Sequence, residues 1–341
     1  MKKTLVAIAA VVATTGAMAE ATLTGSVQVG TNSKSVVTTG AAAVNTFTMG
    51  DDNGNTVFNI GDTEDLGGGL TFKGNIAVET GNTGGTATTL GINGVNETYG
   101  AFIGGFGSIK AGALQTPIFN AGANGDAGGG LLIGNVVWAN NNHQSGTVGS
   151  GVALQASSIQ YTTPTFAEGL SLKYQAAFAG NSGNIGDVQY LAADYKTGAF
   201  AAGIVTSAYE YSSSATDTTT TYYATYDLGV ATLKLLGGNA KTNGYATVTS
   251  TSYGVSVPMG AVTFMYNHSS SDGKVNNGTA TTARVVTAVD QAADFLGASY
   301  SFSKRTTGYA ALYKETGNNG AGTYTATSNI SYTKFIVIHA F

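Results

Sequence analysis

Three residue types in this sequence could support acid–base or nucleophilic chemistry: histidine, serine and the carboxylates. The histidines are His143, His268 and His339, and only His268 is followed by hydroxyl side chains, those of Ser269 and Ser270. Hydrolysis needs a nucleophile, a base and a group that orients the base. Because neighbouring strand residues point to opposite faces, His268 and Ser269 would not meet. The pattern therefore indicates that this chain is not an enzyme.

The sequence also offers little support for metal binding, redox chemistry or nucleic-acid binding. The sequence has no Cys, which excludes disulfides, thiolate catalysis and thiolate metal ligands. Glu64 and Asp65 are adjacent carboxylates, but they fall in a segment with turn composition and no substrate cleft. No metal-ligand spacing, phosphate-binding loop or basic nucleic-acid motif is present in the sequence. We expect no cofactor, no metal and no nucleic-acid partner.

Lysines offer a different chemistry, the attraction of anions. Lys73, Lys173 and Lys234 stand at the polar positions of segments in which apolar and polar residues alternate, whereas Lys110 and Arg305 are less regularly placed. A lysine on a wall that faces water attracts anions and repels cations through a potential of several kT. Each could equally be a solvated surface residue. Their role therefore depends on the elements that position them.

The alternation is clearest between Thr56 and Thr80, where the apolar positions are Leu70, Phe72, Gly74, Ile76 and Val78. The intervening positions are mostly polar, as expected for a strand with one apolar face. Asp62 to Gly69 is acidic and glycine-rich, which favours a tight turn. We therefore predict a hairpin, and the chain repeats this unit without a helical period. Both a soluble sandwich and a barrel fit that pattern.

The N-terminus and the composition favour a barrel in a membrane. Residues 1–19 combine Lys2 and Lys3, an apolar run and the small residues Ala17-Met18-Ala19, which predicts a signal peptide. The run, Leu5 to Ala13, is too short for an anchor, which needs roughly 20 residues. Residues 20–341 would form the mature domain, with the formal charge moving from −4 to −6 on loss of two lysines.

Charged residues make up only 10% of the chain, whereas soluble domains have about 25%. The polar positions of the alternating segments hold Thr, Ser, Asn, Gln and Gly, and no window is apolar enough for a spanning helix. A polar inside and an apolar outside fit a closed barrel, because lipid covers one face and closure satisfies every backbone group. We predict an all-β, transmembrane, antiparallel β-barrel.

Several segments resemble one known family. GDTEDLGGGL at 61–70 and ETYGAFIGGFGSIKAG at 97–112 resemble the second to fifth strands of the trimeric, 16-stranded Gram-negative porins. SIQYTTPTFAEGLSLKYQAAF at 158–178 resembles their sixth and seventh strands, and FLGASYSFSKRTTGYAALY at 295–313 and the terminal Phe341 also match. The resemblance covers nearly the whole mature chain. It implies a homotrimer in the cell outer membrane.

Counting alternating segments also gives sixteen strands. They begin with Ala21 to Thr31, continue through the hairpin of 56–80 and the segments that resemble the family, and end near Asn329 to Phe341. The strands between are expected at 188–194, 200–211, 221–228, 231–241, 251–257, 262–269, 293–303 and 308–314. Ser33 to Asn53 and Ser270 to Gln291 are expected as long exterior loops, and an even count places both termini on the periplasmic side.

The last strand is apolar on both faces. Phe335, Val337 and Phe341 share one parity, which resembles the strand by which outer-membrane assembly machinery takes up porins. A simple closing strand that pairs with the first is compatible with that role. Ile336 and Ile338 lie on the other parity and need burial, either at a subunit interface or beneath an inserted loop.

The longest stretch without alternation is Pro117 to Ala156. A connection of this length is functional or disordered. In the family resembled, the third loop folds into the lumen and narrows the pore. The apolar residues of the stretch are Ile118, Phe119, Leu131, Leu132, Ile133, Val136, Val137 and Trp138. They favour burial, although an exterior loop packed on a trimer neighbour would bury them too.

The sequence departs from its family where solutes would be selected. Such porins usually carry an arginine where Val57 stands here and a lysine where Gly61 stands, and another basic residue near Ala113. The remaining candidates for the pore lining and constriction are Lys73, Lys110, Asp126, Lys173, Lys234 and Arg305. So few fixed charges predict weak charge selectivity.

The resemblance implies a general porin, a water-filled channel for passive diffusion of ions and small hydrophilic solutes. One alternative is a solute-specific channel of the same fold, and another is a surface barrel with adhesin-like loops. Expected partners are outer-membrane lipid and lipopolysaccharide, further copies of the chain in a homotrimer, and the assembly machinery through the strand that ends in Phe341.

Overall fold

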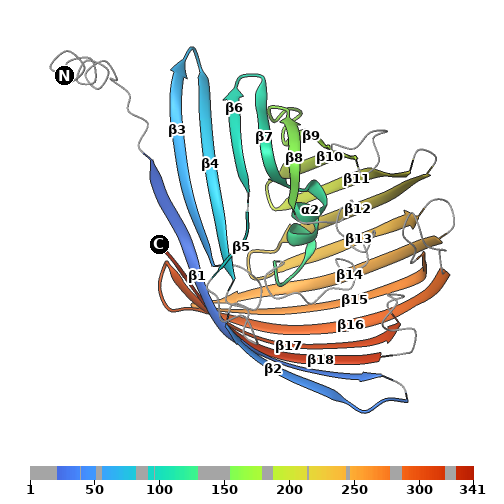
Figure 1. Ribbon diagram of the computed structural model, residues 1–341. Helices are drawn as coiled ribbons and strands as arrows, with labels where there is room; N and C mark the ends of the chain where they lie inside the picture. Colours follow the sequence, from blue (N-terminus) through green and yellow to red (C-terminus); the bar gives the residue numbers. More distant parts are fainter. Residues whose placement is uncertain are drawn as a thin grey trace.

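The computed structural model describes eleven stretches of the chain, and the predicted signal peptide, 1–19, lies outside them. The described residues are 21–38, 40–50, 56–81, 91–95, 97–129, 154–178, 187–212, 215–242, 246–276, 286–318 and 328–341. Antiparallel strands dominate these residues (Figure 1). Within the described part of the chain, no helix is both long enough and apolar enough to cross a membrane.

Eighteen strand segments form one sheet. The first nine are β1 (Thr22–Thr38), β2 (Val44–Gly50), β3 (Val57–Gly67), β4 (Leu70–Gly81), β5 (Gly91–Val95), β6 (Thr98–Gly104), β7 (Gly107–Gln115), β8 (Leu154–Thr162) and β9 (Leu170–Ala177). The others are β10 (Val188–Thr197), β11 (Phe200–Ser212), β12 (Ala215–Asp227), β13 (Thr232–Thr242), β14 (Ala246–Met259), β15 (Val262–Asn276), β16 (Val286–Ser301), β17 (Thr306–Asn318) and β18 (Ser328–Ala340). The sheet closes because β18 pairs with β1, Ser26 lying opposite Ala340.

The eighteen segments occupy sixteen positions around the wall. One end of β1 pairs with β3 and the other with β2, so β2 and β3 together form one interrupted strand. In the same way β5 and β6 both pair with β4, at Val78 to Gly81 and at Thr71 to Asn75. Two positions are therefore each shared by two segments. The predicted 16-stranded antiparallel barrel is confirmed.

Several predicted strand ends are wrong. The expected loop from Ser33 to Asn53 contains the end of β1 and the whole of β2, and the expected turn from Asp62 to Gly69 is mostly part of β3. The expected loop from Ser270 to Gln291 begins with seven residues of β15 and ends with six of β16. β15 continues through residues 270–274, where both faces are polar. Because the alternation of apolar and polar residues stops there, the pattern that locates strands in the sequence is lost.

The two faces of the wall differ as the alternation predicts. On β13, Leu233 and Leu235 are 46% and 39% exposed, while Lys234 between them points to the opposite side. We call these the apolar face and the polar face. Hydroxyl and amide groups bond one another across strands on the polar face: Gln160 Nε2 donates to Gln175 Oε1 at 2.8 Å, and Ser271 Oγ donates to Ser250 Oγ at 2.7 Å. Such pairing satisfies polar groups between neighbouring strands.

The seam between the first and last strands is closely packed. Phe341 and Gly25 exchange two backbone hydrogen bonds, with N–O distances of 3.0 and 3.2 Å, and the ring of Phe341 lies 5.7 Å from that of Phe58. Gly25 leaves the space that this ring fills. A Cβ atom there would lie 2.2 Å from the carbonyl oxygen of Val57 and 2.8 Å from Cζ of Phe341.

Closure can be tested at Gly25. We expect Gly25→Val to destabilise the folded barrel by about 1–3 kcal/mol, because the new side chain overlaps backbone atoms of the adjoining strand. The measurement is the urea concentration at which half of the protein is unfolded, judged on a gel by the different migration of the folded barrel and the unfolded chain. Gly74→Val is the control, since a Cβ atom there has only a Phe72 carbon within 4 Å, at 3.8 Å. Equal midpoints for the two variants would contradict the seam described here.

Candidate functional site

A nine-residue helix, α2 (Pro117–Gly125), follows β7 in the segment that lacks alternation. Thr116 caps it, its side-chain oxygen accepting a hydrogen bond from the Phe119 amide at 3.2 Å, and Pro117 occupies the first turn. Both residues are preferred at these positions, since the cap satisfies a free amide and proline lacks one. The sequence analysis missed this helix, although Thr-Pro is a helix-start signal that could have indicated it.

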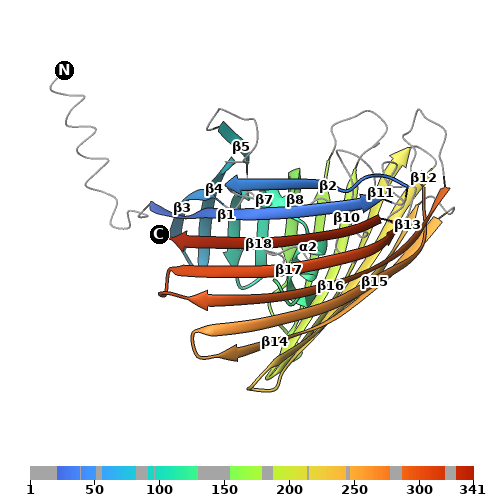
Figure 2. The same cartoon turned by 90° about the horizontal axis from the view of Figure 1, so that it is seen from below.

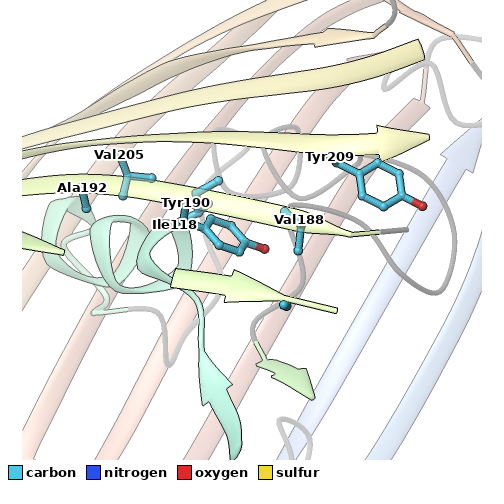
Figure 3. Close-up of a cluster of buried hydrophobic side chains, with 7 residues drawn as sticks. Ile118, Val188, Tyr190, Ala192, Val205 and Tyr209 are labelled. Carbon is cyan, nitrogen blue, oxygen red and sulfur yellow. The ribbon is translucent and has the colours of Figure 1, made fainter. Parts of the chain in front are cut away.

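The helix α2 packs on the polar face of the wall, on the concave side of β10 to β13 (Figure 1). Ile118 is 2% exposed and joins a buried cluster with Tyr190 of β10 and Val205 of β11 (Figure 3). Ala121 joins a second cluster with Tyr223 and Leu236. Ile118 and Ala121 are therefore buried against the chain's own wall, whereas Phe119 is only partly buried.

The end of α2 is held by polar contacts and by close packing. Lys234 donates a hydrogen bond from Nζ to the carbonyl oxygen of Asp126 at 2.7 Å. At Gly125 a Cβ atom would lie 2.8 Å from Cβ of Leu236, so only glycine allows this approach. Beyond it, Ala127 belongs to a buried cluster with Phe295 and Ile336. The segment thus contacts the polar face from β10 across to β18.

Three of the predicted lysines come together. Lys73 of β4, Lys110 of β7 and Lys173 of β9 line one cavity of about 360 Å³ on the polar face, and we call them the lysine group. Lys110 pairs with Glu97, with Nζ 3.0 Å from Oε1, and lies 3.9 Å from the ring centroid of Tyr99. One of the three cations is therefore paired with a carboxylate.

Two further cavities lie between α2 and the wall. The smaller, about 290 Å³, is lined by Asn120 and Asn124 of α2 together with Lys173 and Asp194. The larger, about 800 Å³, is lined by Asp194 and Lys234 among others. The phenol of Tyr223 donates to Asp194 Oδ1 at 2.9 Å. Opposite charges therefore face the same space.

Glu97 and Asp194 are not among the site residues predicted from the sequence. Asp194 shares the parity of Val188, Tyr190 and Ala192, all buried on the polar face, so the alternation could have indicated it. The Glu97 carboxylate lies just before β6 and is identified only by its contact with Lys110.

The other predicted site residues lie elsewhere. Asp126 is 1% exposed, so its backbone rather than an open carboxylate meets Lys234. Arg305 is exposed in the turn between β16 and β17, away from the three cavities. His143 and residues 130–153 of the long loop, Trp138 included, lie outside the described residues.

His268 has a carboxylate partner, but on the apolar face. Its Nδ1 lies 2.9 Å from Asp294 Oδ1, and the Tyr266 phenol donates to the same oxygen at 2.8 Å. Both side chains are partly exposed. Among the described residues no group of three His, Asp or Glu side chains could hold a metal ion. This pair is therefore remote from the cavities lined by lysine.

A closed antiparallel barrel with an apolar outer face and a polar inner face is typical of membrane-spanning β-barrels. A family model described as Gram-negative porin matches residues 6–321, and the chain belongs to this family. The major outer membrane protein P.IB of Neisseria gonorrhoeae is 32% identical over 209 residues. That match covers 59% of this chain and 55% of the relative, so the chain spans about half the length of the curated relatives it matches.

Solved structures share the fold. An anion-selective porin from Comamonas acidovorans superimposes with a TM-score of 0.74 at 20% identity, covering 95% of this chain and all of the other. Salmonella typhi OmpF, in complex with daunomycin, gives a TM-score of 0.63 at 14% identity, covering 95% and 98% of the two chains. At these identities the likeness concerns the fold alone.

The packing of α2 can be tested by cross-linking, since the chain has no cysteine. We expect the double variant Ala121→Cys with Leu236→Cys to be joined by a short bifunctional thiol reagent, because these residues pack in one cluster. Ala121→Cys with Ala311→Cys is the matched control, since Ala311 belongs to a different cluster. The measurement is the yield of cross-linked chain in detergent and in vesicles. Similar yields for both pairs would show that the helix does not rest on β13.

Proposed function

We propose that this chain forms a water-filled channel in the outer membrane of a Gram-negative bacterium, through which ions and small hydrophilic solutes diffuse passively. The observation that carries the proposal is the polar inner face, on which lysines and carboxylates border cavities of about 290 to 800 Å³. A wall of this kind accommodates water and solutes. Family membership points to a channel rather than an enzyme.

The segment that contains α2 narrows the channel in this proposal. Its support is the contact of Ile118, Ala121 and Ala127 with three buried clusters on strands from β9 to β18. A segment fixed at so many points resists displacement by passing solute. Lys173 and Lys234 then lie beside the narrowest part, because they line the cavities next to the helix.

The charge selectivity is weak and favours anions. The lysine group attracts anions, since fixed charges in a low-dielectric wall raise the local concentration of counter-ions. Glu97 offsets Lys110 at 3.0 Å, and Asp194 shares a cavity with Lys173. Among the described residues, Lys73, the third member of the lysine group, has neither a carboxylate partner of the Glu97 kind nor a place in the cavity that Asp194 lines. The Comamonas porin is named as anion-selective, which agrees with the direction proposed here.

We also propose that the channel is a homotrimer. One structural relative, OmpT of Vibrio cholerae, is described in a trimer form. Outer-membrane lipid and lipopolysaccharide would surround the apolar face. The last strand would meet the assembly machinery through outward aromatic side chains, and Phe335 and Phe341 are 57% and 37% exposed.

Planar bilayer recordings test the channel. We expect an ohmic conductance step in concentrated potassium chloride, because nothing in a passive pore requires turnover. A conductance that one sugar or dicarboxylate saturates would instead support a solute-specific channel. Absence of any step from a correctly folded barrel would refute the proposal and favour a surface barrel with adhesin-like loops.

Reversal potentials in a salt gradient test the lysine group. Glu97→Gln is expected to increase the preference for anions because it releases Lys110 from its partner, and Lys73→Gln is expected to decrease it. Lys304→Gln removes the same charge from an exposed turn and serves as the control. Were Lys73→Gln and Lys304→Gln to shift the potential equally, the cavity lined by the lysine group would not set the selectivity.

A further inference from the structure

The regular pairing of strands is interrupted at one level of the wall. β4 pairs with β6 as far as Asn75 and with β5 only from Val78, so its ladder is broken between these two residues. β5 is a separate short arrow beside β4 (Figure 2). On the other side of β6, the register of β7 against β8 shifts between Gly112 and Leu114. The break and the shift lie level with each other, because Tyr99 of β6 is opposite both Asn75 and Gly112.

Side chains replace the missing backbone pairing at this level. The amide of Ala77 donates to Thr98 Oγ1 at 3.1 Å, and Asn75 Nδ2 donates to the carbonyl oxygen of Glu97 at 2.6 Å. Backbone groups in a membrane-spanning wall need partners within the protein. The residues just before and at the start of β6 therefore complete a wall that strand pairing alone leaves open.

The carboxylate of Glu97 spans the shift in β7. Its Oε1 accepts a hydrogen bond from Lys110 Nζ at 3.0 Å and another from the backbone amide of Gln115 at 3.3 Å. Lys110 precedes the register shift and Gln115 follows it. The ring of Tyr99 lies 3.9 Å from the same ammonium group. One carboxylate oxygen thus joins the two parts of β7.

The second of these parts leads directly into α2. Gln115 is the last residue of β7, and the next residue, Thr116, is the helix cap and is 0% exposed. In Figure 1, β7 continues into α2 on the concave side of the wall. No flexible connection separates the amide that Glu97 binds from the first turn of the helix. The position of Gln115 therefore sets the point at which the helix begins.

We propose that Glu97 is a positioning residue for the narrow part of the channel, because its carboxylate fixes the end of β7 and, through it, the entry of α2 into the lumen. The inference rests on the proposed role of the α2 segment in narrowing the pore. It adds to the charge effect of Glu97 a second effect, on the position of the helix.

The contact with Gln115 distinguishes this role from simple charge compensation. A counter-charge for Lys110 only has to lie near the ammonium group, and a pair whose side chains are 22% and 27% exposed contributes little where water reaches it. The hydrogen bond to the Gln115 amide ends instead at a fixed point of the backbone. It therefore restrains the path of the chain as well as the local charge.

Thiol labelling of the full-length mature barrel in detergent tests the proposal, since the chain has no cysteine of its own. Ala121→Cys on α2 is the reporter, because Ala121 is 4% exposed and a water-soluble maleimide reaches it only when the helix leaves the wall. We expect Glu97→Ala to raise the labelling rate about tenfold, since a hydrogen bond to a charged group is strong enough to change an equilibrium by about that factor.

Two conservative variants separate position from charge. Glu97→Gln keeps an oxygen that can accept from the Gln115 amide, and Lys110→Gln keeps the whole carboxylate. Both should label within about twofold of the barrel that carries the reporter alone, because the amide of Gln115 retains its acceptor. Their reversal potentials should shift in opposite directions, toward anions for Glu97→Gln and toward cations for Lys110→Gln.

A second reporter controls for general loosening of the barrel. Ser271→Cys lies on β15, where Ser271 is 2% exposed, and replaces only an oxygen by a sulfur. It should label equally slowly in all variants. Because labelling does not require conduction, the result is independent of the channel proposal.

Three results would overturn the proposal. Unchanged labelling of Ala121→Cys in Glu97→Ala would show that α2 is held without this carboxylate. An equal rise in Glu97→Ala and Lys110→Gln would reduce Glu97 to a counter-charge. An equal rise at Ser271→Cys would mean that Glu97 stabilises the whole barrel and not the position of the helix.

Discussion

The barrel depends on one constraint, that every backbone amide and carbonyl inside a lipid layer must find a partner within the protein. The pairing of β18 with β1 meets it by leaving the sheet without an edge. This seam requires glycine at position 25, because the Phe341 ring and the Val57 carbonyl occupy the space that a side chain would need. The first and last strands therefore meet at a closely packed junction.

Closure gives each strand two unlike faces, and this separates the chemistry of the chain into two sets. Lys73, Lys110 and Lys173 reach one cavity from three strands because they share the inner parity. His268 and Asp294 lie on the outer parity, so a pair that would suggest catalysis in a cleft faces away from the pore. The position of a residue along the alternation, more than its type, decides what it can contact.

Much of this arrangement can be predicted from the sequence. The features that cannot be predicted have a physical reason for it. Alternation predicts sixteen strands and the inward direction of Lys73, Lys173 and Lys234, because lipid enforces a period of two. It does not predict where β15 ends, since residues 270–274 are polar on both faces. Nor does it reveal the contact of Lys234 with Asp126, which joins residues 108 apart in the sequence and depends on the path of a loop.

The strands near the C-terminus carry apolar side chains on both faces of the wall. On β18, Ile336 is 1% exposed and packs with Ala127 and Phe295 inside, while Phe335 and Val337 are 57% and 40% exposed on the outer face. On β17, Ala311 lies in the inner cluster and Ala310, on the other parity, lies between Ala298 and Phe335. Backbone alone separates the two sets of contacts.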